Sequence, residues 1–393
     1  MTASPVYLHA LGMVNALGND VGAIRRNLEA GHSPGMVEAD RPDGTTAIVG
    51  RALASLELAP PAHLAAYDCR NNRLLLAAVA QIEPALDAAR AQYGPHRIGI
   101  VLGTSTSGID AAEAALRHAK THGALPDGFD YRQMEIGTLA PFAAAVLGTT
   151  GPAYTVSTAC TSSAKAFASA RRLLQLHVCD AVIVGGVDSL CELTLQGFAS
   201  LESTSAARTN PMSRNRTGIN IGEGAAVFLM SREPGLVRLA GAGESSDAHH
   251  ISAPDPTGAG AERALRIALA DAGIDASAIG YVNLHATATR KNDEMEAHLM
   301  ARVFPHGVPS SGTKPLTGHT LGAAGATELG FAWLALAHEG STLPRHVWDG
   351  EADPALPALD LIDGTHQLAA GQYVMSNSFA FGGSNASLIL GRG

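Results

Sequence analysis

The chain has 393 residues, which is too long for one ordinary hydrophobic core and indicates two domains or two fused halves. Hydrophobic residues make up 46% and charged residues only 16% of it, so the composition excludes a disordered protein and favours a heavily buried enzyme with a sizeable subunit interface. The formal net charge of −9 argues against DNA, RNA or an anionic membrane as the partner.

We expect neither a secretion signal nor a membrane span. Residues 1–8 lack the basic segment and the long apolar stretch of a signal peptide. The nearest candidate for a span, 329–337, is much shorter than the roughly 20 residues that cross a bilayer. The four cysteines form no CxxC pair, which is consistent with a reducing compartment. The protein is therefore expected to be soluble and cytoplasmic.

The first half of the chain contains two predicted helices and three predicted buried strands. The helices cover 72–90 and 162–176, and the second of them is rich in small side chains that allow close packing. Each strand is a short apolar run that ends at glycine, threonine or a polar turn, and the three runs are 98–104, 181–186 and 225–230.

Cys160 stands between a β-like run and the helix predicted at 162–176. The N–H groups and the partial positive charge of a helix N-terminus can lower the pKa of a nearby thiol from about 8.5 toward neutrality. We therefore predict that Cys160 is a reactive thiolate. Cys69, Cys179 and Cys191 lack partner cysteines and are predicted to be ordinary buried residues without a disulfide or metal role.

The second half repeats this order of elements. Strands are predicted at 279–285, 373–377 and 386–390, and helices at 261–272 and 321–337. The strands have counterparts in the first half, so we infer a duplicated α/β chain. Its halves should face each other across a pseudo-two-fold axis, with the catalytic cleft between them.

The polar turn at 231–235 is the best place to divide the two halves. This division gives an N-terminal half at 1–232, which contains Cys160, and a C-terminal half at 233–393. In the C-terminal half, His285 ends a predicted strand and His319 lies in a loop rich in glycine and threonine. One thiol and two imidazoles indicate acyl chemistry.

With these residues the sequence resembles the β-ketoacyl-acyl-carrier-protein synthases of the thiolase superfamily, the condensing enzymes of fatty-acid and polyketide assembly. The resemblance spans nearly the whole chain and rests on ordered motifs, which are 11–18, Thr158-Ala159-Cys160, 221–225, His285, Lys314, His319 and 377–385. It implies a thiolase-like α/β fold, in which the duplicated halves form a five-layered αβαβα architecture.

The resemblance also implies the reaction, a decarboxylative Claisen condensation. Cys160 would take an acyl chain from a carrier thioester, with the backbone N–H groups of Cys160 and Phe381 as the oxyanion hole. His285 and His319 would bind the malonyl thioester carbonyl and stabilise the enolate left by loss of carbon dioxide. Attack of this carbanion on the acyl-Cys160 thioester gives a 3-oxoacyl product. The substrates are carried on phosphopantetheine, and no other cofactor and no metal is expected.

Four residues have supporting roles by the same resemblance. Lys314 and Glu328 are predicted to form a pair that fixes the orientation and protonation of the His319 imidazole. The alternative is a surface lysine and a glutamate on a helix face. Asp293 and Glu296 follow the first histidine at the spacing of the family's acidic pair, which is predicted to support the site.

Three threonines are candidate substrate-binding residues. Thr287 and Thr289 match threonines that bond the phosphopantetheine arm in the family, and the alternative is that they are simple β-branched strand residues. Thr106 lies in a loop that would reach the acyl pocket near the dimer interface. Its small side chain is predicted to leave room for a long or rigid acyl chain.

The loop around Phe381 is predicted to be a gate over the cysteine. Gly382 and Gly383 permit backbone conformations that are closed to other residues, which suits a hinge. The sequence departs from the family pattern at two positions. Ala286, directly after His285, and Ala380, directly before Phe381, stand where glycine is usual. A methyl group at either place is expected to alter loop motion or pocket shape.

Two further departures concern charge. Ser213 replaces an acidic residue that is common in the family, which removes a charge pairing. The segment 60–68 has none of the basic residues with which many relatives bind the acidic carrier protein, leaving Arg70 and Arg73 as candidates. These departures suggest a specialised pathway, such as polyene or polyketide assembly.

The expected partners are an acyl carrier protein and a second ketosynthase-like subunit, in a homodimer or a heterodimer with a related chain. The main alternative is a non-catalytic subunit like a chain-length factor, but such subunits lack the nucleophile that Cys160 supplies. A degradative thiolase needs a second cysteine near the C-terminus, and none follows Cys191. An initiating synthase has asparagine in place of His319. The best interpretation is an elongating 3-oxoacyl-acyl-carrier-protein synthase, an acyltransferase.

Overall fold

The computed structural model describes residues 4–393 except 41–43, 55, 339 and 341. In this part of the chain, ten strands form one mixed sheet, and a separate hairpin pairs β2 (Met36–Asp40) with β3 (Thr46–Gly50). The strands of the large sheet are β1 (Tyr7–Val14), β4 (Ile98–Gly103), β5 (Ala153–Val156), β6 (Ala181–Asp188), β7 (Gly224–Ser231), β8 (Val237–Ser246), β9 (Ile279–Asn283), β10 (Ser310–Ser311), β11 (Tyr373–Phe379) and β12 (Ser384–Arg392).

The large sheet contains the same topology twice. The first half has the order β1-β7-β6-β4-β5, and the second half has the order β8-β12-β11-β9-β10. The directions also match, because β7 and β12 run antiparallel to both of their neighbours, whereas β4 and β9 run parallel to theirs. The two halves join where β1 pairs with β8 at Tyr7 and Leu8. This repetition confirms the predicted duplication, and the halves share one continuous sheet.

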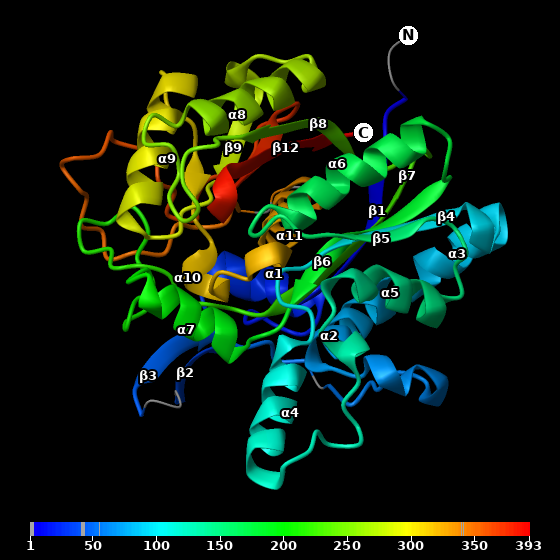
Figure 1. The fold of residues 1–393 in the computed structure, drawn as a ribbon. Coiled ribbons are helices and arrows are strands. Elements are labelled where there is room, and N and C mark those ends of the chain that lie inside the picture. Colours follow the sequence, from blue (N-terminus) through cyan, green and yellow to red (C-terminus); the bar gives the residue numbers. More distant parts are fainter. Residues whose placement is uncertain (1–3, 41–43, 55, 339, 341) are drawn as a thin grey trace.

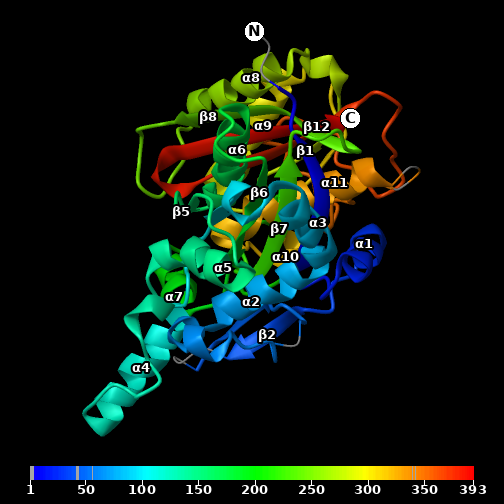
Figure 2. The same ribbon diagram turned by 90° about the vertical axis from the view of Figure 1, so that its right-hand side faces the viewer.

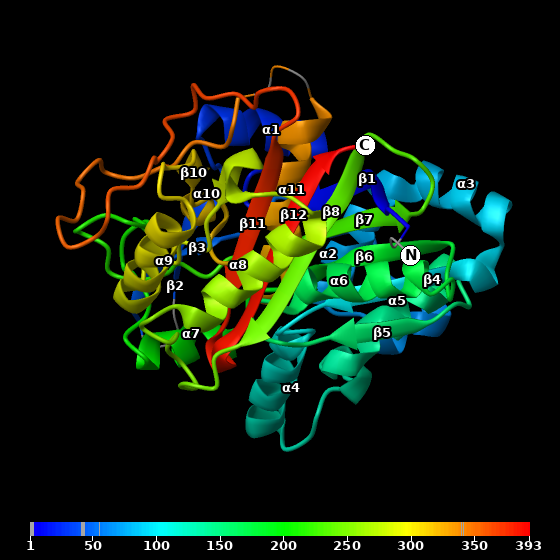
Figure 3. The ribbon, with the colours of Figure 1, turned by 90° about the horizontal axis from the view of Figure 1, so that it is seen from above.

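Two helices lie between the halves and complete the layered order. α6 (Ser162–Gln175) and α11 (Ala324–Ala337) contact each other, and each of them also contacts strands of both halves. α2 (Arg70–Val79), α3 (Glu83–Tyr93) and α5 (Leu139–Leu147) cover the first half from outside, and α8 (Ala259–Ala272) packs on β8 and β12 (Figures 1 and 3). These contacts give the predicted five layers. The remaining α-helices are α1 (Val21–Ala30), α4 (Ile109–His122), α7 (Glu192–Ser200), α9 (Arg290–Val303) and α10 (Lys314–Thr317).

Side chains at the middle of the molecule are small because the backbones approach closely there. A Cβ atom on Gly103, at the end of β4, would lie 2.4 Å from the backbone nitrogen of Ser163 in α6. A Cβ atom on Gly325, in the first turn of α11, would lie 2.8 Å from the Cβ atom of Ala164. Any larger residue would push α6 away from the sheet and from α11.

The helix predicted over 72–90 is not continuous. The region 72–90 forms α2, a 3-10 turn at Ala80–Ile82 and then α3. Pro84 lies in the first turn of α3, where its missing N–H costs nothing, but the same residue could not continue α2 without losing a hydrogen bond. The other predicted helices and strands are present, with ends that differ by a few residues. The predicted division at 232/233 falls in the turn between β7 and β8.

Two further sequence predictions concern the cysteines and the membrane. All four cysteines are free and buried, as predicted for Cys69, Cys179 and Cys191. Among the helices of the described residues, none combines the length and the hydropathy that a bilayer crossing requires.

His346 makes the stability of the fold sensitive to acid. Its Nδ1 accepts from the Gly312 N–H at 2.9 Å, and its Nε2 lies 3.0 Å from the Pro211 carbonyl oxygen, so the buried ring is neutral. Burial lowers the pKa of His346 to about 4. Between that value and the unfolded value of about 6.5, the unfolded chain binds a proton that the folded chain does not.

We therefore predict that the free energy of unfolding falls as the pH drops from about 6.5 toward 4, with a share of about 3 kcal/mol from this residue at the lower end. His346→Gln keeps one donor and one acceptor but does not titrate. Thermal unfolding of both proteins between pH 8 and 5 should show a weaker pH dependence for the variant. Identical pH dependence would contradict the assignment.

Candidate active site

A sharp turn places Cys160 between β5 and α6. The residue before it, Ala159, has a φ of 53°, a left-handed conformation that costs a non-glycine residue on the order of 1 kcal/mol. Two hydrogen bonds to the carbonyl oxygen of Ala159 hold the turn, one from the Ser162 hydroxyl at 2.6 Å and one from the Ser105 hydroxyl at 3.2 Å. The thiol therefore has a fixed position in front of α6.

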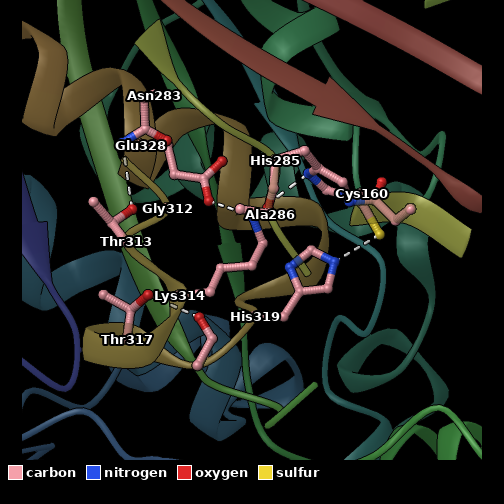
Figure 4. Close-up of polar contacts among 12 residues, drawn as sticks. Cys160, Asn283, His285, Ala286, Gly312, Thr313, Lys314, Thr317, His319 and Glu328 are labelled. Carbon is pink, nitrogen blue, oxygen red and sulfur yellow. Dashed lines mark hydrogen bonds and ion pairs between the residues drawn. The ribbon is translucent and has the colours of Figure 1, made fainter. Parts of the chain in front are cut away.

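The second half supplies His319 to the same point. Nε2 of His319 lies 2.9 Å from Sγ of Cys160 (Figure 4). The backbone of His319 is held on both sides, since its N–H donates to the Asn220 carbonyl at 2.7 Å and its carbonyl accepts from Gly222 at 2.9 Å. The thiol and the imidazole thus meet although they are 159 positions apart in the chain.

Burial decides the protonation of this pair. Burial raises the pKa of the Cys160 thiol to about 12, although the charge of Lys314 and the backbone N–H of Phe381 act in the opposite direction. Burial also lowers the pKa of His319 well below 6.5. The neutral thiol and neutral imidazole are therefore the stable form. The predicted lowering of the Cys160 pKa is wrong, because desolvation outweighs the helix N-terminus.

Lys314 contacts His285 instead of the predicted His319. Its Nζ lies 3.5 Å from Nδ1 of His285 and also donates to the His285 carbonyl. An ammonium group only donates, so Nδ1 of His285 is unprotonated and Nε2 carries the proton. Nδ1 of His319 has no hydrogen-bond partner among the described residues. The tautomer of His285 is therefore fixed, and that of His319 is free to change.

The predicted partner of Lys314 is present. Oε1 of Glu328 lies 2.5 Å from Nζ of Lys314, and both side chains are buried (Figure 4). This burial excludes the alternative of a surface lysine. The ion pair keeps a positive charge next to His285, and burial together with this charge lowers the pKa of His285 well below 6.5. His285 is thus a neutral hydrogen-bond donor.

Two buried carboxylates hold the loop after His285. Glu296 accepts from the backbone N–H groups of His285 and Ala286, both at 2.7 Å, and Asp293 accepts from Ala288 at 3.1 Å. Burial raises the pKa of Glu296 to about 7. The loop needs this support because Ala286 and Ala288 have φ values of 40° and 62°.

Ala286 stands where the family usually has glycine, and its methyl group is accommodated by the chain opposite. A Cβ atom on Gly312 would lie 2.5 Å from the Cβ atom of Ala286. Glycine at position 312 therefore makes room for the methyl group of Ala286.

A cavity of about 340 Å³ opens in front of the cysteine. Its lining includes six of the predicted site residues, which are Cys160, His285, Thr287, Thr289, His319 and Phe381. Thr287 and Thr289 have their hydroxyl oxygens 3.0 Å apart, so both face the same part of the wall.

Phe381 stands at the cavity, in a loop that backbone hydrogen bonds hold on both sides. Its ring packs against Phe198 with 5.2 Å between the centroids, and Phe198 was not predicted because the helix that carries it, α7, was not recognised. Gly382 has a φ of 80° and is exposed, whereas Gly383 also has a positive φ but lies against Asp247. The carbonyl of Ile251 accepts from Gly382 at 2.7 Å and closes the loop.

Thr106 does not belong to this group of residues. It is absent from the described cavity lining, and its hydroxyl donates to the buried carboxylate of Asp188 at 2.8 Å. Its role in an acyl pocket stays a prediction. Asp188 itself was not predicted, because it ends a run that reads only as a buried strand.

Cys160, His285 and His319 could together hold a metal ion. Sγ of Cys160 and one ring nitrogen each of His285 and His319 lie within 4.8 Å of one another. Thiolate and imidazole are the ligands that Zn²⁺ prefers, so zinc would compete for the same atoms. The absence of a metal role stays a prediction.

This chain is similar to known proteins over most of its length. Residues 59–234 match the model of the β-ketoacyl synthase N-terminal domain, and residues 236–347 match that of the C-terminal domain. Nodulation protein E of Rhizobium meliloti is 33% identical over 304 residues, which cover 74% of this chain and 75% of the relative. The 3-oxoacyl-[acyl-carrier-protein] synthase 2 of Vibrio harveyi is 27% identical over 419 residues and covers 99% of both chains.

A solved structure is more similar to this chain in sequence than these two relatives are. A chain in the complex of the ketosynthase ApeO with its chain length factor ApeC from Xenorhabdus doucetiae superimposes with a TM-score of 0.95. It is 46% identical in sequence, and the match covers 99% of this chain and 98% of that one.

The gate can be tested through its glycine. Gly382→Ala adds a methyl group into open space, so its only cost is the positive φ, about 1–2 kcal/mol. Gly371→Ala is a matched control, since Gly371 has a φ of 81° and equally open surroundings away from the cavity lining. We expect both variants to lose similar thermal stability, but only Gly382→Ala to change the rate at which iodoacetamide alkylates Cys160. Equal alkylation rates in the two variants would argue against a gate.

Proposed function

This chain belongs to the β-ketoacyl synthase family, and we propose that Cys160, His285 and His319 perform the family's condensation in it. The enzyme is a 3-oxoacyl-acyl-carrier-protein synthase of fatty-acid or polyketide assembly. The observation that carries the assignment of residues is the 2.9 Å contact between Sγ of Cys160 and Nε2 of His319, with His285 in the same cavity.

In the first step Cys160 takes the acyl chain. Sγ attacks the carbonyl carbon of an acyl-carrier thioester while Nε2 of His319 accepts the thiol proton. The carbonyl oxygen gains negative charge against the backbone N–H groups of Cys160 and Phe381. When the carbon–sulfur bond to the carrier breaks, the proton passes from His319 to the departing pantetheine sulfur, which balances the step.

In the second step the histidines act together on malonyl-carrier. Acylation removes the thiol proton that faced His319, and no partner among the described residues fixes the proton of that ring on Nδ1. Water that enters the cavity can take the proton from Nδ1 and deliver one to Nε2, which changes the tautomer without changing the charge. Both Nε2–H groups then donate to the malonyl thioester oxygen. Loss of carbon dioxide leaves an enolate, whose carbon attacks the acyl-Cys160 carbonyl. A carbon–carbon bond forms, the bond to Sγ breaks, and the thiolate regains a proton from water.

The alternative of a non-catalytic subunit like a chain-length factor is less favoured. Such a subunit needs no nucleophile, whereas Cys160 has a base at hydrogen-bond distance and a second histidine beside it. Each of these features serves chemistry and adds nothing to a purely structural role.

The carrier protein is proposed to approach the cavity at Arg290 and Lys291. Both residues belong to the cavity lining at the start of α9, directly after Thr289, and both are exposed. Neither forms a salt bridge with another described residue, so their charges are available to an acidic carrier or to the phosphate of its arm. The earlier candidates are engaged elsewhere, because Arg70 pairs with Glu223 and Arg73 pairs with Asp68.

A second ketosynthase-like subunit, identical or related, is proposed to cover the face around α4 and β5. α4 projects from the body (Figures 1 and 2), and Leu116, Leu125 and Tyr131 on and after it are 65%, 51% and 63% exposed. β5 is the last strand at its end of the sheet, so its outer edge is open to pairing. A heterodimer is supported by the similar structure of a ketosynthase with its chain length factor. A cytoplasmic location remains a prediction.

The nucleophile is tested by intact-mass analysis. After incubation with acyl-carrier protein, the wild type should gain the mass of one acyl group, and addition of malonyl-carrier should yield the 3-oxoacyl product. Cys160→Ala should gain no mass, whereas the control Cys191→Ala, at another buried thiol, should be acylated like the wild type. Failure of the wild type to accept any acyl donor would instead support the non-catalytic alternative.

The approach of the carrier is tested by removing both charges at the cavity. Arg290→Ala combined with Lys291→Ala should raise KM for malonyl-carrier about tenfold at low salt, with a smaller effect at high salt and on kcat. Arg25→Ala combined with Arg26→Ala in α1, outside the cavity lining, is the matched control and should leave KM within about twofold. Equal KM values for the two double variants would place the docking surface elsewhere.

A further inference from the structure

We propose that Asp188 is a positioning residue, which holds Cys160 and His319 at reacting distance by tying together the loops that carry them. The proposal rests on the function proposed above. It concerns a buried carboxylate at the end of β6 that lies behind the reactive pair and outside the described cavity lining.

One oxygen of Asp188 gathers the loop after β4. Oδ1 accepts from the Thr104 hydroxyl at 2.6 Å, from the Ser105 N–H at 2.7 Å, and from both the N–H and the hydroxyl of Thr106 at 2.8 Å. This loop reaches the nucleophile directly, because the Ser105 hydroxyl donates to the carbonyl of Ala159, the residue before Cys160.

The other oxygen binds the segment that follows His319. Oδ2 accepts from the Ala323 N–H at 3.2 Å, in the 3-10 turn Leu321–Ala323 between His319 and α11. The Thr104–Thr106 loop and the turn Leu321–Ala323 are closely packed against each other. A Cβ atom on Gly322 would lie 2.6 Å from the Ser105 hydroxyl oxygen and 2.7 Å from Oδ2 of Asp188.

The chemistry of these contacts requires a carboxylate. All five groups that bind Asp188 are donors, and they approach both of its oxygens. An asparagine at this position would turn its NH₂ toward the Ala323 N–H or toward the Thr104–Thr106 loop, and one set of hydrogen bonds would be lost. A buried group left without partners is costly, so one of the two loops would have to move.

The negative charge of Asp188 opposes ionisation of the Cys160 thiol. We therefore infer that Asp188 serves the geometry of the site and not its electrostatics. Asp188 is fully buried and has no salt bridge with any described residue, in contrast to Glu223, which is equally buried but pairs with Arg70. Its negative charge raises the pKa of the Cys160 thiol and so opposes ionisation of the nucleophile. A residue that promoted ionisation of Cys160 through its charge would have to be positively charged.

Asp188→Asn removes a set of hydrogen bonds and a negative charge. Together these two losses give the variant a signature that simple loss of stability does not produce. The variant should lose at least tenfold in kcat for condensation, with KM for malonyl-carrier within about twofold, because the reacting distance is lost while the cavity wall remains. At the same time the pH midpoint of Cys160 alkylation by iodoacetamide should shift downward, because a negative charge is gone.

Wild-type turnover is measured first, so that failure of the proposed function is seen separately from failure of this inference. If the wild type turns over and Asp188→Asn keeps kcat within twofold, the inference is overturned. A lowered kcat with an equally changed KM for malonyl-carrier also overturns it, because the loss then reflects general damage. If the variant does not fold, Thr104→Val, which removes one donor to Oδ1, should reduce kcat with KM unchanged, and equal kcat in that variant overturns the inference.

Discussion

The site depends on the close approach of α6 and α11 in the middle layer. Gly103 and Gly325 allow the first turn of α6 to touch both the end of β4 and the first turn of α11. Because the two helices occupy equivalent positions in the two halves, their N-terminal ends meet, and the residues just before them meet as well. Cys160 precedes α6 and His319 precedes α11, so the reactive pair is a direct result of the duplicated fold.

The two histidines are both buried and neutral, but their hydrogen-bond partners give them different properties. His285 faces a lysine that can only donate, which fixes its proton on Nε2, whereas the free Nδ1 of His319 leaves that ring able to exchange its tautomer. One ring is therefore a permanent donor, and the other can first accept a proton and later donate one. The buried Lys314–Glu328 ion pair maintains this difference.

Much of this could be predicted from the sequence, and the exceptions have physical reasons. Apolar runs such as 181–186 predict buried strands, and the settings of Cys160, His285 and His319 single out three side chains that the structure brings together. Contacts between distant segments are not visible in local patterns. The sequence therefore predicts a contact of Lys314 with His319, five residues away, although Lys314 contacts His285, and it gives no sign that Asp188, at the end of a strand, binds a loop more than 80 residues away. The pKa of Cys160 was predicted in the wrong direction because desolvation depends on the whole interior.

The position of β1 has a consequence for how the chain folds. β1 is among the first segments to be synthesised, but it lies between β7 and β8, and its partners are more than 200 residues further along the chain. The pairing with β7 covers Tyr7–Val14, so the sheet of the N-terminal half cannot be completed until β7, at the end of that half, has been synthesised. Such long-range pairing slows folding, because a long loop must close before β1 has its main partner.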